Sequence, residues 1–480
     1  MPKSESPGEA RQAGAGTSAG RGLDWLPRIA GGDRVKYAQV IEAIEAAVSS
    51  GRLPPGERLP SHRELATHLG VTIATLSKAI GEMRRRGRLV ARQGAGTFIA
   101  GPPVDISDAA SRPGPLDLAL NRPPVAPVAT LLGRELAAMA AQPSAAEALG
   151  YEPIGGALPA RSDGAAWLRL RDLPVSTERV LLTQGTHEGL LVALMAVTRP
   201  GDRVLCEALN YTGLRRIASL LQIELVGVPV APAGLDVEAF ARLCRDGTAR
   251  AAVLTPVTQN PTTATLGAAE RRAVLAAARA AGMIVIEDDI YGHLADDRAP
   301  LLGRLEPDGV IVVTSLSKSV AAGLRLGYVV APPQLGLRVQ ESLYALGWTA
   351  PALHTSLVAR LIATGAAEAC VRAQRAEALE RGRLARERLG AALRPAGAVA
   401  TYHVWLPLPE RWHAEDFAAE LLMQDLRVSP AYHFVHGGGL APAAVRLSLG
   451  AVEDRAALLT ALERIAAMLA CGRPGRGAIV

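Results

Sequence analysis

A single lysine follows an apolar run in the stretch VIVVTSLSKSVAAGLRLGY, which spans residues 310–328. A desolvated lysine amine loses its proton more easily and can then form a Schiff base with an aldehyde. Lys318 is therefore a candidate nucleophile, although an ordinary surface lysine is the alternative when this residue is considered alone. Arg325, Ser315 and Ser317 add a planar guanidinium and short hydroxyls, which are suitable donors to a phosphate.

Three further apolar runs also end in polar residues. RVLLT precedes the tetrapeptide QGTH, AAVLT runs into PVTQNPTT, and MIVIE is followed by Asp288 and Asp289. Ligands of open α/β sheets bind beyond the carboxyl ends of the strands, so we expect all four segments to meet at one site. Gly185, Thr186 and His187 open a predicted helix, whose free N–H groups would form an anion site.

The remaining polar groups describe an aromatic cofactor. Asp288 would pair with a protonated pyridine nitrogen, whereas its neighbour Asp289 is expected to cap a turn or to face solvent. Tyr291 and Asn260 would hydrogen-bond a phenolate oxygen. Tyr211 would stack on the ring, with simple packing as its alternative role. Together with the lysine and the phosphate donors, these groups describe pyridoxal 5′-phosphate (PLP), tethered by the lysine.

The first hundred residues have a different character. They contain 15 Lys and Arg against 9 Asp and Glu, whereas the rest of the chain contains 37 of each. A basic region of this kind is typical of proteins that bind the phosphate backbone of nucleic acids. Apolar stripes predict helices over residues 37–51, 61–70 and 73–87, and Ser61 with Glu64 forms a capping-box pattern at the second helix. Two short helices joined by a tight turn indicate a helix-turn-helix, and RLVARQGAGTFIA predicts a hairpin after it.

These segments resemble the winged helix-turn-helix of the GntR family, through GRLPPGERLPSHRELATHLGVTIATLSKAI and RQGAGTFIA. The resemblance implies double-stranded DNA as a partner, because such a recognition helix presents polar residues to base edges while basic residues hold phosphates. Thr72-Ile73 stands where the family often has Ser-Arg, so a base preference cannot be carried over. An ordinary exposed side chain is the alternative at each position. The residues expected to face DNA are Arg63, Thr72, Thr75 and Lys78, with Gln93 and Gly94 in the wing.

The chain divides into two main parts along its length. Residues 1–33 are predicted to be a disordered tail, residues 34–100 a DNA-binding domain, and residues 101–115, rich in Pro, Gly, Ser and Asp, a linker. Over residues 116–470 apolar strands alternate with helical stretches, which predicts an α/β domain with a mostly parallel sheet. Residues 471–480 are expected to form a second tail.

The larger part resembles a fold-type I aminotransferase of class I/II, through TQGTHEGL, QNPTT, EDDIYGHL, SLSKSVAAGLRLGY and VRLSLG. The resemblance implies PLP bound as a Schiff base to Lys318 and a smaller C-terminal α+β subdomain. It also implies a homodimer in which Tyr151 reaches the phosphate of the neighbouring subunit. In addition, it implies that Arg446 holds a substrate or effector carboxylate and that Asn121 lies nearby.

The combination of head and body resembles the MocR subfamily of transcriptional regulators. We therefore predict a PLP-dependent DNA-binding regulator whose effector is a small amino compound or PLP itself. The alternatives are a working aminotransferase with an accessory DNA-binding head, and a DNA-binding module with an inactive dimerising scaffold. Thr263 and Ala322 replace the family's usual glycine and proline, which puts turnover in doubt more than cofactor binding and leaves enzyme activity open.

Composition argues against several other classes of protein. No uninterrupted apolar run approaches the roughly 20 residues that a membrane helix needs, and the N-terminus lacks the apolar stretch of a signal peptide. The four cysteines contain no Cys-x-x-Cys pair, which argues against a zinc site and a disulfide framework. We accordingly expect a cytoplasmic protein without a metal or a membrane partner.

Overall fold

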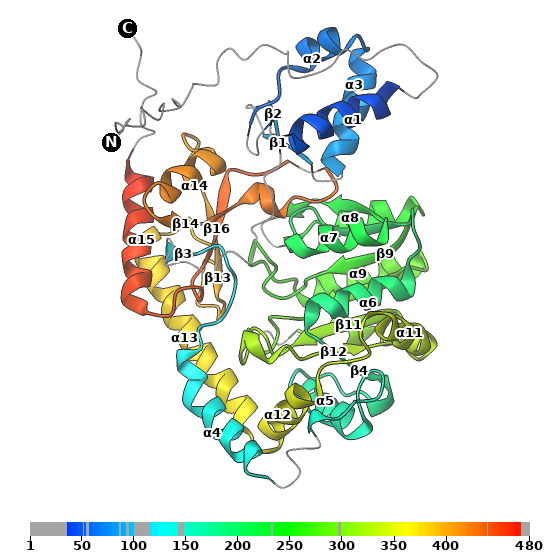
Figure 1. The fold of residues 1–480 in the computed structure, drawn as a ribbon, viewed down its shortest axis with the longest axis vertical. Helices are drawn as coiled ribbons and strands as arrows, with labels where there is room; N and C mark the ends of the chain where they lie inside the picture. Colours follow the sequence, from blue (N-terminus) through cyan, green and yellow to red (C-terminus); the bar gives the residue numbers. More distant parts are fainter. Residues whose placement is uncertain are drawn as a thin grey trace, which may run out of the picture.

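The structure is a computed structural model, and it describes residues 36–471 apart from gaps at residues 51, 54–56, 86–87, 93–95, 100–115, 143–147, 232–233, 296–298 and 439. The predicted N-terminal tail and linker lie outside the described residues, as do Gln93 and Gly94 of the predicted wing. A small head and a larger α/β body make up the molecule (Figure 1). Among the described helices, none is long and apolar enough to cross a membrane. The same residues contain no group of three or more His, Cys, Asp or Glu arranged to hold a metal ion.

The head contains the predicted three helices and hairpin. Its elements are α1 (Lys36–Ser49), α2 (His62–Leu69), α3 (Ile73–Arg85) and the antiparallel strands β1 (Leu89–Arg92) and β2 (Gly96–Ile99). Apolar residues from all three helices are buried against one another, so the orientation of α3 on the head is fixed by packing. Members of this small core include Ile44, Leu65, Leu69, Leu76 and Met83.

The start and the end of α2 follow from local sequence. Ser61 Oγ accepts a hydrogen bond from the backbone N–H of Glu64, and the Glu64 carboxylate accepts one from the backbone N–H of Ser61. The predicted capping box is therefore confirmed. Gly70 ends the helix at a φ of 68°, a left-handed conformation that glycine adopts without strain.

A seven-stranded sheet forms the centre of the body. Its strand order is β4-β12-β11-β10-β9-β5-β6, and all neighbours are parallel except β12, which is antiparallel to both β11 and β4. The mostly parallel sheet predicted from the sequence is thus confirmed. The strands are β4 (Val180–Thr183), β5 (Arg203–Glu207), β6 (Glu224–Val228), β9 (Ala249–Leu254), β10 (Ile284–Asp288), β11 (Val310–Ser315) and β12 (Gly327–Val330).

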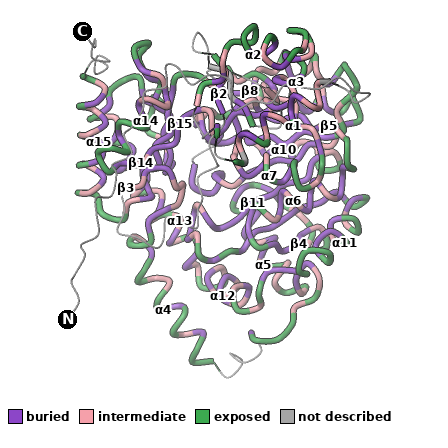
Figure 2. Tube along the Cα trace, turned by 45° about the horizontal axis from the view of Figure 1, so that its top comes forward, coloured by how far each residue is buried: buried purple, intermediate pink, exposed green. Residues whose placement is uncertain are grey.

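Helices cover both faces of this sheet and create two apolar cores. Successive strand residues point to opposite faces, so Leu181 belongs to one core and Leu182 to the other. Strands buried on both sides appear as the continuous apolar runs seen in the sequence, and Figure 2 shows them as the buried centre of the molecule. One face carries α6 (Thr186–Val197), α7 (Thr212–Leu221) and α11 (Gly336–Leu346). The other carries α5 (Leu158–Arg169), α8 (Val237–Arg245), α9 (Ala268–Ala280), α10 (Leu302–Leu305) and α12 (Ala352–Ala363).

The predicted α+β subdomain lies beside the sheet domain, after the long helix α13 (Ala366–Leu389). It contains an antiparallel sheet of β13 (His403–Pro407), β16 (Ala444–Ser448) and β15 (Ser429–Pro430), covered by α14 (Ala414–Leu422) and α15 (Arg455–Ala470). The first described strand of the body, β3 (Leu116–Asp117), pairs in parallel with β14 (Leu426–Arg427). The chain that follows the head therefore enters this subdomain first. It then continues into α4 (Ala129–Ala140). The short strands β7 (Val230–Ala231) and β8 (Gly234–Leu235), which follow β6 in the chain, pair antiparallel.

Candidate functional site

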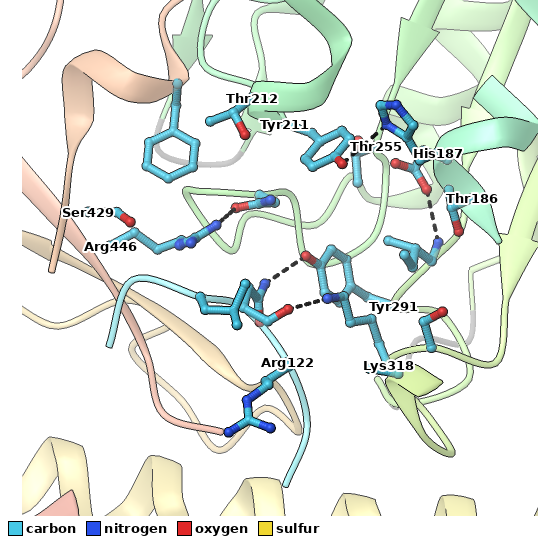
Figure 3. Close-up of a pocket in the computed structure, with 18 of the residues that line it drawn as sticks. Arg122, Thr186, His187, Tyr211, Thr212, Thr255, Tyr291, Lys318, Ser429 and Arg446 are labelled. Atoms are coloured by element: carbon cyan, nitrogen blue, oxygen red, sulfur yellow. Dashed lines mark hydrogen bonds between the residues drawn. The ribbon is translucent and has the colours of Figure 1, made fainter. Parts of the chain in front are cut away.

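A cavity of about 370 Å³ opens where the carboxyl ends of the sheet strands meet the C-terminal subdomain (Figure 3). The polar segments after β4, β9, β10 and β11 all contribute to its wall, together with the segment that follows β3. Gly185 and Ser315 lie directly behind the wall rather than on it, and Tyr151 lies on the molecular surface. The predicted residues that line the cavity are Asn121, Thr186, His187, Tyr211, Asn260, Asp288, Tyr291, Ser317, Lys318, Arg325 and Arg446.

The Lys318 side chain is half-buried and lines this cavity, so it is not an ordinary surface lysine. Its Nζ donates a hydrogen bond to the main-chain oxygen of Asn121. Burial lowers the pKa of Lys318 to about 8, and the nearby charges of Arg446 and Arg325 act in the same direction. An amine with this pKa is unprotonated in a substantial fraction of molecules near neutral pH, which is the form that attacks a carbonyl carbon.

Two adjacent carboxylates at the end of β10 have different environments. Burial raises the pKa of Asp288 to about 7, with a further contribution from the neighbouring Asp289 and Glu207. Asp288 lines the cavity and is available to a cationic partner there. Asp289 is buried and pairs with Arg171 through two contacts of 3.0 and 3.1 Å. The expectation that Asp289 caps a turn or faces solvent is therefore wrong, because this buried ion pair compensates its charge.

One end of the cavity has the donors that a phosphate needs. Thr186, at the start of α6, donates to Ser315 Oγ at 3.0 Å, and Ser315 Oγ also accepts from the backbone N–H of Ser317 at 3.3 Å. Ser317 Oγ is buried and has no hydrogen-bond partner among the described residues. The Arg325 guanidinium lies against Gly185, where a Cβ atom would come within 3.2 Å of it. These groups fit an anion that would satisfy the unpaired hydroxyl and the guanidinium together.

The imidazole of His187 and the ring of Tyr211 line the wall next to these donors, since His187 follows Thr186 in the chain. Tyr211 Oη lies 3.3 Å from Nδ1 of His187, and the two rings meet edge to face at 6.0 Å. Burial lowers the pKa of His187, and the charges of Arg325 and Arg216 reinforce this effect. Tyr211 is thus held at the cavity by a specific contact, which suits a ring that stacks on a planar ligand.

Arg446 on β16 is a buried cation at the other end of the cavity. Its Nη1 donates to Asn260 Oδ1 at 2.9 Å and its Nη2 donates to the main-chain oxygen of Ala119. The guanidinium lies over the ring of Phe434, 4.7 Å from its centre. Burial lowers the pKa of Arg446 to about 10, so the group stays protonated at neutral pH. Because its Nε has no partner in the described part of the chain, Arg446 can still bind a carboxylate.

The loop that carries Asn260 also contains Thr263, which replaces the family's usual glycine. Thr263 has a φ of 66°, in the left-handed region that favours glycine, and its N–H donates to the Gln259 carbonyl at 2.6 Å. The threonine therefore costs some backbone strain but keeps the turn. Gln259 ties the same loop to Leu209 through its side-chain amide.

The sequence analysis did not predict several residues in and around the site. His403 opens β13, lies against the Tyr291 ring at 4.9 Å and contacts Asn121, but a lone histidine at a strand start gives no local signal. Glu207 ends β5 and accepts hydrogen bonds from the Thr255 N–H and the Asn210 side chain. A carboxylate at the end of a strand was a usable signal for Glu207, as it was for Asp288. His403 and Glu207 lie behind the cavity wall, and the unpredicted residues on the wall itself include Arg122, Thr255, Ser429, His433 and Phe434.

The predicted DNA-facing residues of the head lie on its exposed surface. Arg63, Thr72 and Lys78 are exposed, and Thr75 is half-buried. Thr72 Oγ1 accepts from the backbone N–H of Thr75 at 3.1 Å, so Thr72 also satisfies the start of α3. The Lys78 amine lies over the Tyr37 ring, 4.5 Å from its centre. The face is polar and basic, as DNA binding requires.

Head and body together define the class of the molecule: a winged helix-turn-helix joined to a fold-type I aminotransferase body. The chain belongs to the class I and II aminotransferase family, because residues 115–465 match the family model "Aminotransferase class I and II". Residues 36–99 match the model "Bacterial regulatory proteins, gntR family", so the head is of the DNA-binding GntR type. The aminotransferase family uses PLP, which is the cofactor predicted from the sequence.

Relatives named as HTH-type transcriptional regulators agree with the MocR resemblance. The uncharacterised HTH-type transcriptional regulator YdeF of Bacillus subtilis is 28% identical over 89% of this chain and 93% of its own. The HTH-type pyridoxine biosynthesis transcriptional regulator PdxR of Corynebacterium glutamicum is 33% identical over 68% of this chain and 73% of its own. The crystal structure of LysN, the α-aminoadipate aminotransferase of Thermus thermophilus, has a TM-score of 0.67 and 25% identity. It covers 76% of this chain and 95% of that one.

Proposed function

We propose that this protein is a PLP-dependent transcriptional regulator that binds double-stranded DNA through its head and senses a small amino compound, or PLP itself, through its body. The observation that carries the proposal is the presence, in one chain, of a GntR-type head and a cavity that retains Lys318, Asp288 and Arg325. The proposed division is a DNA-binding domain over residues 34–100, a linker over 101–115 and a sensor domain over 116–470.

The cofactor would be held by groups at each of its ends. Lys318 would bind its aldehyde carbon, Asp288 would accept a hydrogen bond from its ring nitrogen, and Tyr211 would stack on its face. Ser317, Arg325 and the backbone N–H of Thr186 would donate to its phosphate, with His187 beside them and Gly185 and Ser315 behind the wall. When bound, PLP supplies an aldehyde that reacts reversibly with amines, so that Lys318 and an amino-compound effector compete for it. Tyr291 and Asn260 would donate to its ring oxygen.

The effector would be an amino compound that carries an anionic group. Arg446 is a buried cation whose two terminal nitrogens are held by Asn260 and Ala119, which orients its fork toward the cavity. A carboxylate there would satisfy the unpaired Nε of Arg446, with Asn121 beside it. These two residues are the proposed effector-binding groups.

Contacts between the cavity and the head support a regulatory role. A connecting loop, residues 433–438, begins at the cavity wall with His433 and Phe434. It packs tightly on the β5–α7 turn and on β6, since a Cβ atom on Gly437 would come within 1.9 Å of the Gly227 nitrogen. At its far end, the Gly438 carbonyl accepts a hydrogen bond from Arg84 of α3.

A second connection leaves the cavity through the segment after β3. The Asn121 and Ala119 carbonyls accept hydrogen bonds from Lys318 and Arg446, the two groups proposed to bind cofactor and effector. This segment follows residues 100–115, through which the chain arrives from the head. A ligand that changes either hydrogen bond would favour one arrangement of head and body, as ligand control of DNA binding requires.

A homodimer is part of the proposal. Tyr151 is 94% exposed and its ring lies 5.6 Å from that of Trp348, which stacks in turn on Tyr344 at 6.1 Å. An exposed aromatic cluster of this kind suits contact with a second copy, where Tyr151 would reach the partner's phosphate site. Two heads in a dimer would bind paired DNA half-sites. Because the partner is double-stranded DNA, we propose that the protein acts in the cytoplasm.

The proposal is tested by measuring binding of the full chain to the DNA upstream of its own gene and of the neighbouring gene. We expect a footprint whose position or affinity changes when PLP is added, and no change with pyridoxine 5′-phosphate, which lacks the aldehyde. Weak, salt-sensitive binding that is indifferent to PLP at these sites would contradict the proposal.

A working aminotransferase is the second candidate, and the lowered pKa of Lys318 beside an intact Arg446 favours it. Its test is a screen of amino donors, with a 2-oxo acid present to accept the amino group, for keto-acid release by the PLP-loaded protein, with Lys318→Ala as the control. Rapid turnover in the absence of DNA, combined with unspecific DNA binding, would favour the enzyme over the regulator.

A further inference from the structure

His403 is a fully buried imidazole that the proposed cofactor contacts do not include. It opens β13 in the C-terminal subdomain and lies against the Tyr291 ring of the sheet domain, with 4.9 Å between ring centres. Burial, reinforced by the charges of Arg446 and Lys318, lowers the pKa of His403 to about 3. The ring is therefore neutral at neutral pH, with one nitrogen that donates and one that accepts.

The surroundings of His403 determine which nitrogen carries the proton. Nε2 lies 3.2 Å from the main-chain oxygen of Gln259, which can only accept a hydrogen bond, so Nε2 must be the donor. Nδ1 is then an acceptor, and it faces the Asn121 Nδ2 at 3.4 Å and the Thr401 hydroxyl at 3.2 Å. The fixed tautomer of His403 thus requires donors on its other side.

This requirement orients the Asn121 amide. If the amide were turned over, its oxygen would face the lone pair of Nδ1 and the contact would be repulsive. In the observed orientation Asn121 Nδ2 donates to both His403 Nδ1 and Tyr291 Oη, the latter at 2.9 Å. Asn121 Oδ1 is left without a partner among the described residues, which indicates that the two donations by Nδ2 determine the orientation.

The orientation of Asn121 in turn determines the direction of the Tyr291 hydroxyl proton. Tyr291 Oη accepts from Asn121, so its own O–H is free to donate into the cavity that it lines. We infer that His403 is a positioning residue, which holds the Asn121 amide so that Tyr291 presents its proton to the ring oxygen of the cofactor. This inference rests on the proposed cofactor site and assigns His403, Asn121 and Tyr291 a joint role there.

The test is a pH titration of the visible absorption band of the full chain loaded with PLP. Replacing His403 by phenylalanine removes the acceptor but retains an aromatic ring, whereas glutamine can donate to Gln259 and accept from Asn121. The charged or titratable groups that face Lys318 and Tyr291 are Arg446, Arg325, Asp288 and Tyr211, and all are unchanged in these variants. Circular dichroism and thermal unfolding check that each variant folds.

We expect His403→Phe to raise the titration midpoint of the band by about 0.5–1 pH unit, the equivalent of one lost hydrogen bond. The shift is upward because a lost donor leaves the cofactor's ring oxygen free to share the proton on the linked lysine nitrogen. His403→Gln should titrate like the wild type. Tyr291→Phe should shift the midpoint in the same direction, and the double variant His403→Phe/Tyr291→Phe should shift it no further than Tyr291→Phe alone.

The possible failures are distinguishable. This inference would be overturned if the band of His403→Phe had the same titration midpoint as the wild type. It would also be overturned if His403→Phe and His403→Gln shifted the midpoint equally. Either result would leave the proposed cofactor site standing. Additive shifts in the double variant would also overturn it, because His403 would then act independently of Tyr291. If the wild-type protein forms no visible band with PLP, the proposed function fails, and this inference fails with it.

Discussion

The cavity of the body and the DNA-facing surface of the head are built in opposite ways. The cavity collects buried polar groups from distant parts of the chain, and burial shifts the pKa values of Lys318, Asp288 and Arg446. The head presents exposed groups on a small helical core, as with Arg63, Thr72 and Lys78. The topology of the sheet creates the first region, whereas the second is the exposed surface of a small domain. Chemistry that depends on shifted proton affinities therefore belongs to the body, and recognition of DNA by exposed polar groups belongs to the head.

The largest effect that separates the two regions is expected from Lys318→Ala. The variant lacks the only side chain proposed to bind the cofactor covalently, so the visible absorption band of the PLP-loaded protein should disappear. The variant should still bind DNA without PLP, because the head has its own apolar core, which does not include Lys318. The measurements are an absorption spectrum and a fluorescence anisotropy titration with DNA.

A retained band in Lys318→Ala would contradict the assignment of this lysine. A complete loss of DNA binding without PLP would contradict the independent folding of the head. Ser319→Ala is a suitable control, because it lies next to Lys318 but its hydroxyl does not line the cavity.

The same contrast explains what the sequence could predict. Asp288 ends one apolar strand and Lys318 follows another, and in a mostly parallel sheet such positions meet at one edge, so their spacing predicted that they lie together. Arg325 was predicted with them because it lies in the same segment as Lys318. The capping box of Ser61 and Glu64 is a local pattern, and it was predicted correctly.

Residues whose role depends on a distant partner were not predictable in this way. Asp289 was misjudged because its partner, Arg171, lies 118 residues earlier in the chain. His403 was missed because its contact with Asn121 spans 282 residues and crosses from the C-terminal subdomain to the segment after β3. A single sequence carries no information about such pairings, since burial and the approach of the two domains create them.

The second prediction tests the head alone. Arg63→Ala removes an exposed cation from α2, and we expect DNA affinity to fall at least about 5-fold and the dependence of log K on log salt to decrease by about one. The visible band of bound PLP should be unchanged. Arg272→Ala, an exposed arginine on α9 of the body, is the matched control for the loss of one positive charge. Equal affinity of Arg63→Ala and wild type at every salt concentration would show that this arginine does not contact DNA.

The third prediction tests the connection between the two regions. Arg84→Gln weakens the hydrogen bond to the Gly438 carbonyl at the end of the connecting loop. Total couplings between sites are typically 5–150-fold, so we expect this variant to reduce the PLP-dependent change in DNA affinity by a few-fold. The measurement is a DNA titration with and without PLP.

A matched control for Arg84 is Arg88→Gln, which removes an equivalent charge from the same basic stretch. Arg88 is exposed and lies 3.8 Å from Glu45 of the head. Both variants should lower DNA affinity to a similar extent if these arginines bind phosphates. Only Arg84→Gln should also reduce the response to PLP, and an equal response in the two variants would assign the coupling to another route.

The smallest expected effect concerns the pH dependence of stability in the cofactor-free protein. Burial raises the pKa of Asp288 to about 7, above its value of about 4 in an unfolded chain. Below about pH 4, Asp288 is protonated in both the folded and the unfolded chain, so it does not lower the free energy of unfolding. As the pH rises from about 4 through about 7, the unfolded chain ionises first and the folded state loses this stability. Asp288→Asn removes the group that must ionise in a buried site. Its melting temperature should therefore exceed that of the wild type by a few degrees at pH 8 and by less at pH 5.5.

Comparison of two proteins is essential for this last measurement, because other buried groups titrate as well. Buried neutral histidines such as His403 and His436 make the folded protein less stable as the pH falls. This change opposes the effect of the buried carboxyl groups on the melting temperature. The difference between wild type and Asp288→Asn cancels these contributions and isolates one carboxyl group. Asp308→Asn, an exposed control, should give the same difference at both pH values. If Asp288→Asn behaves like this control, then Asp288 ionises in the empty cavity without cost, and the contrast between buried body and exposed head does not extend to it.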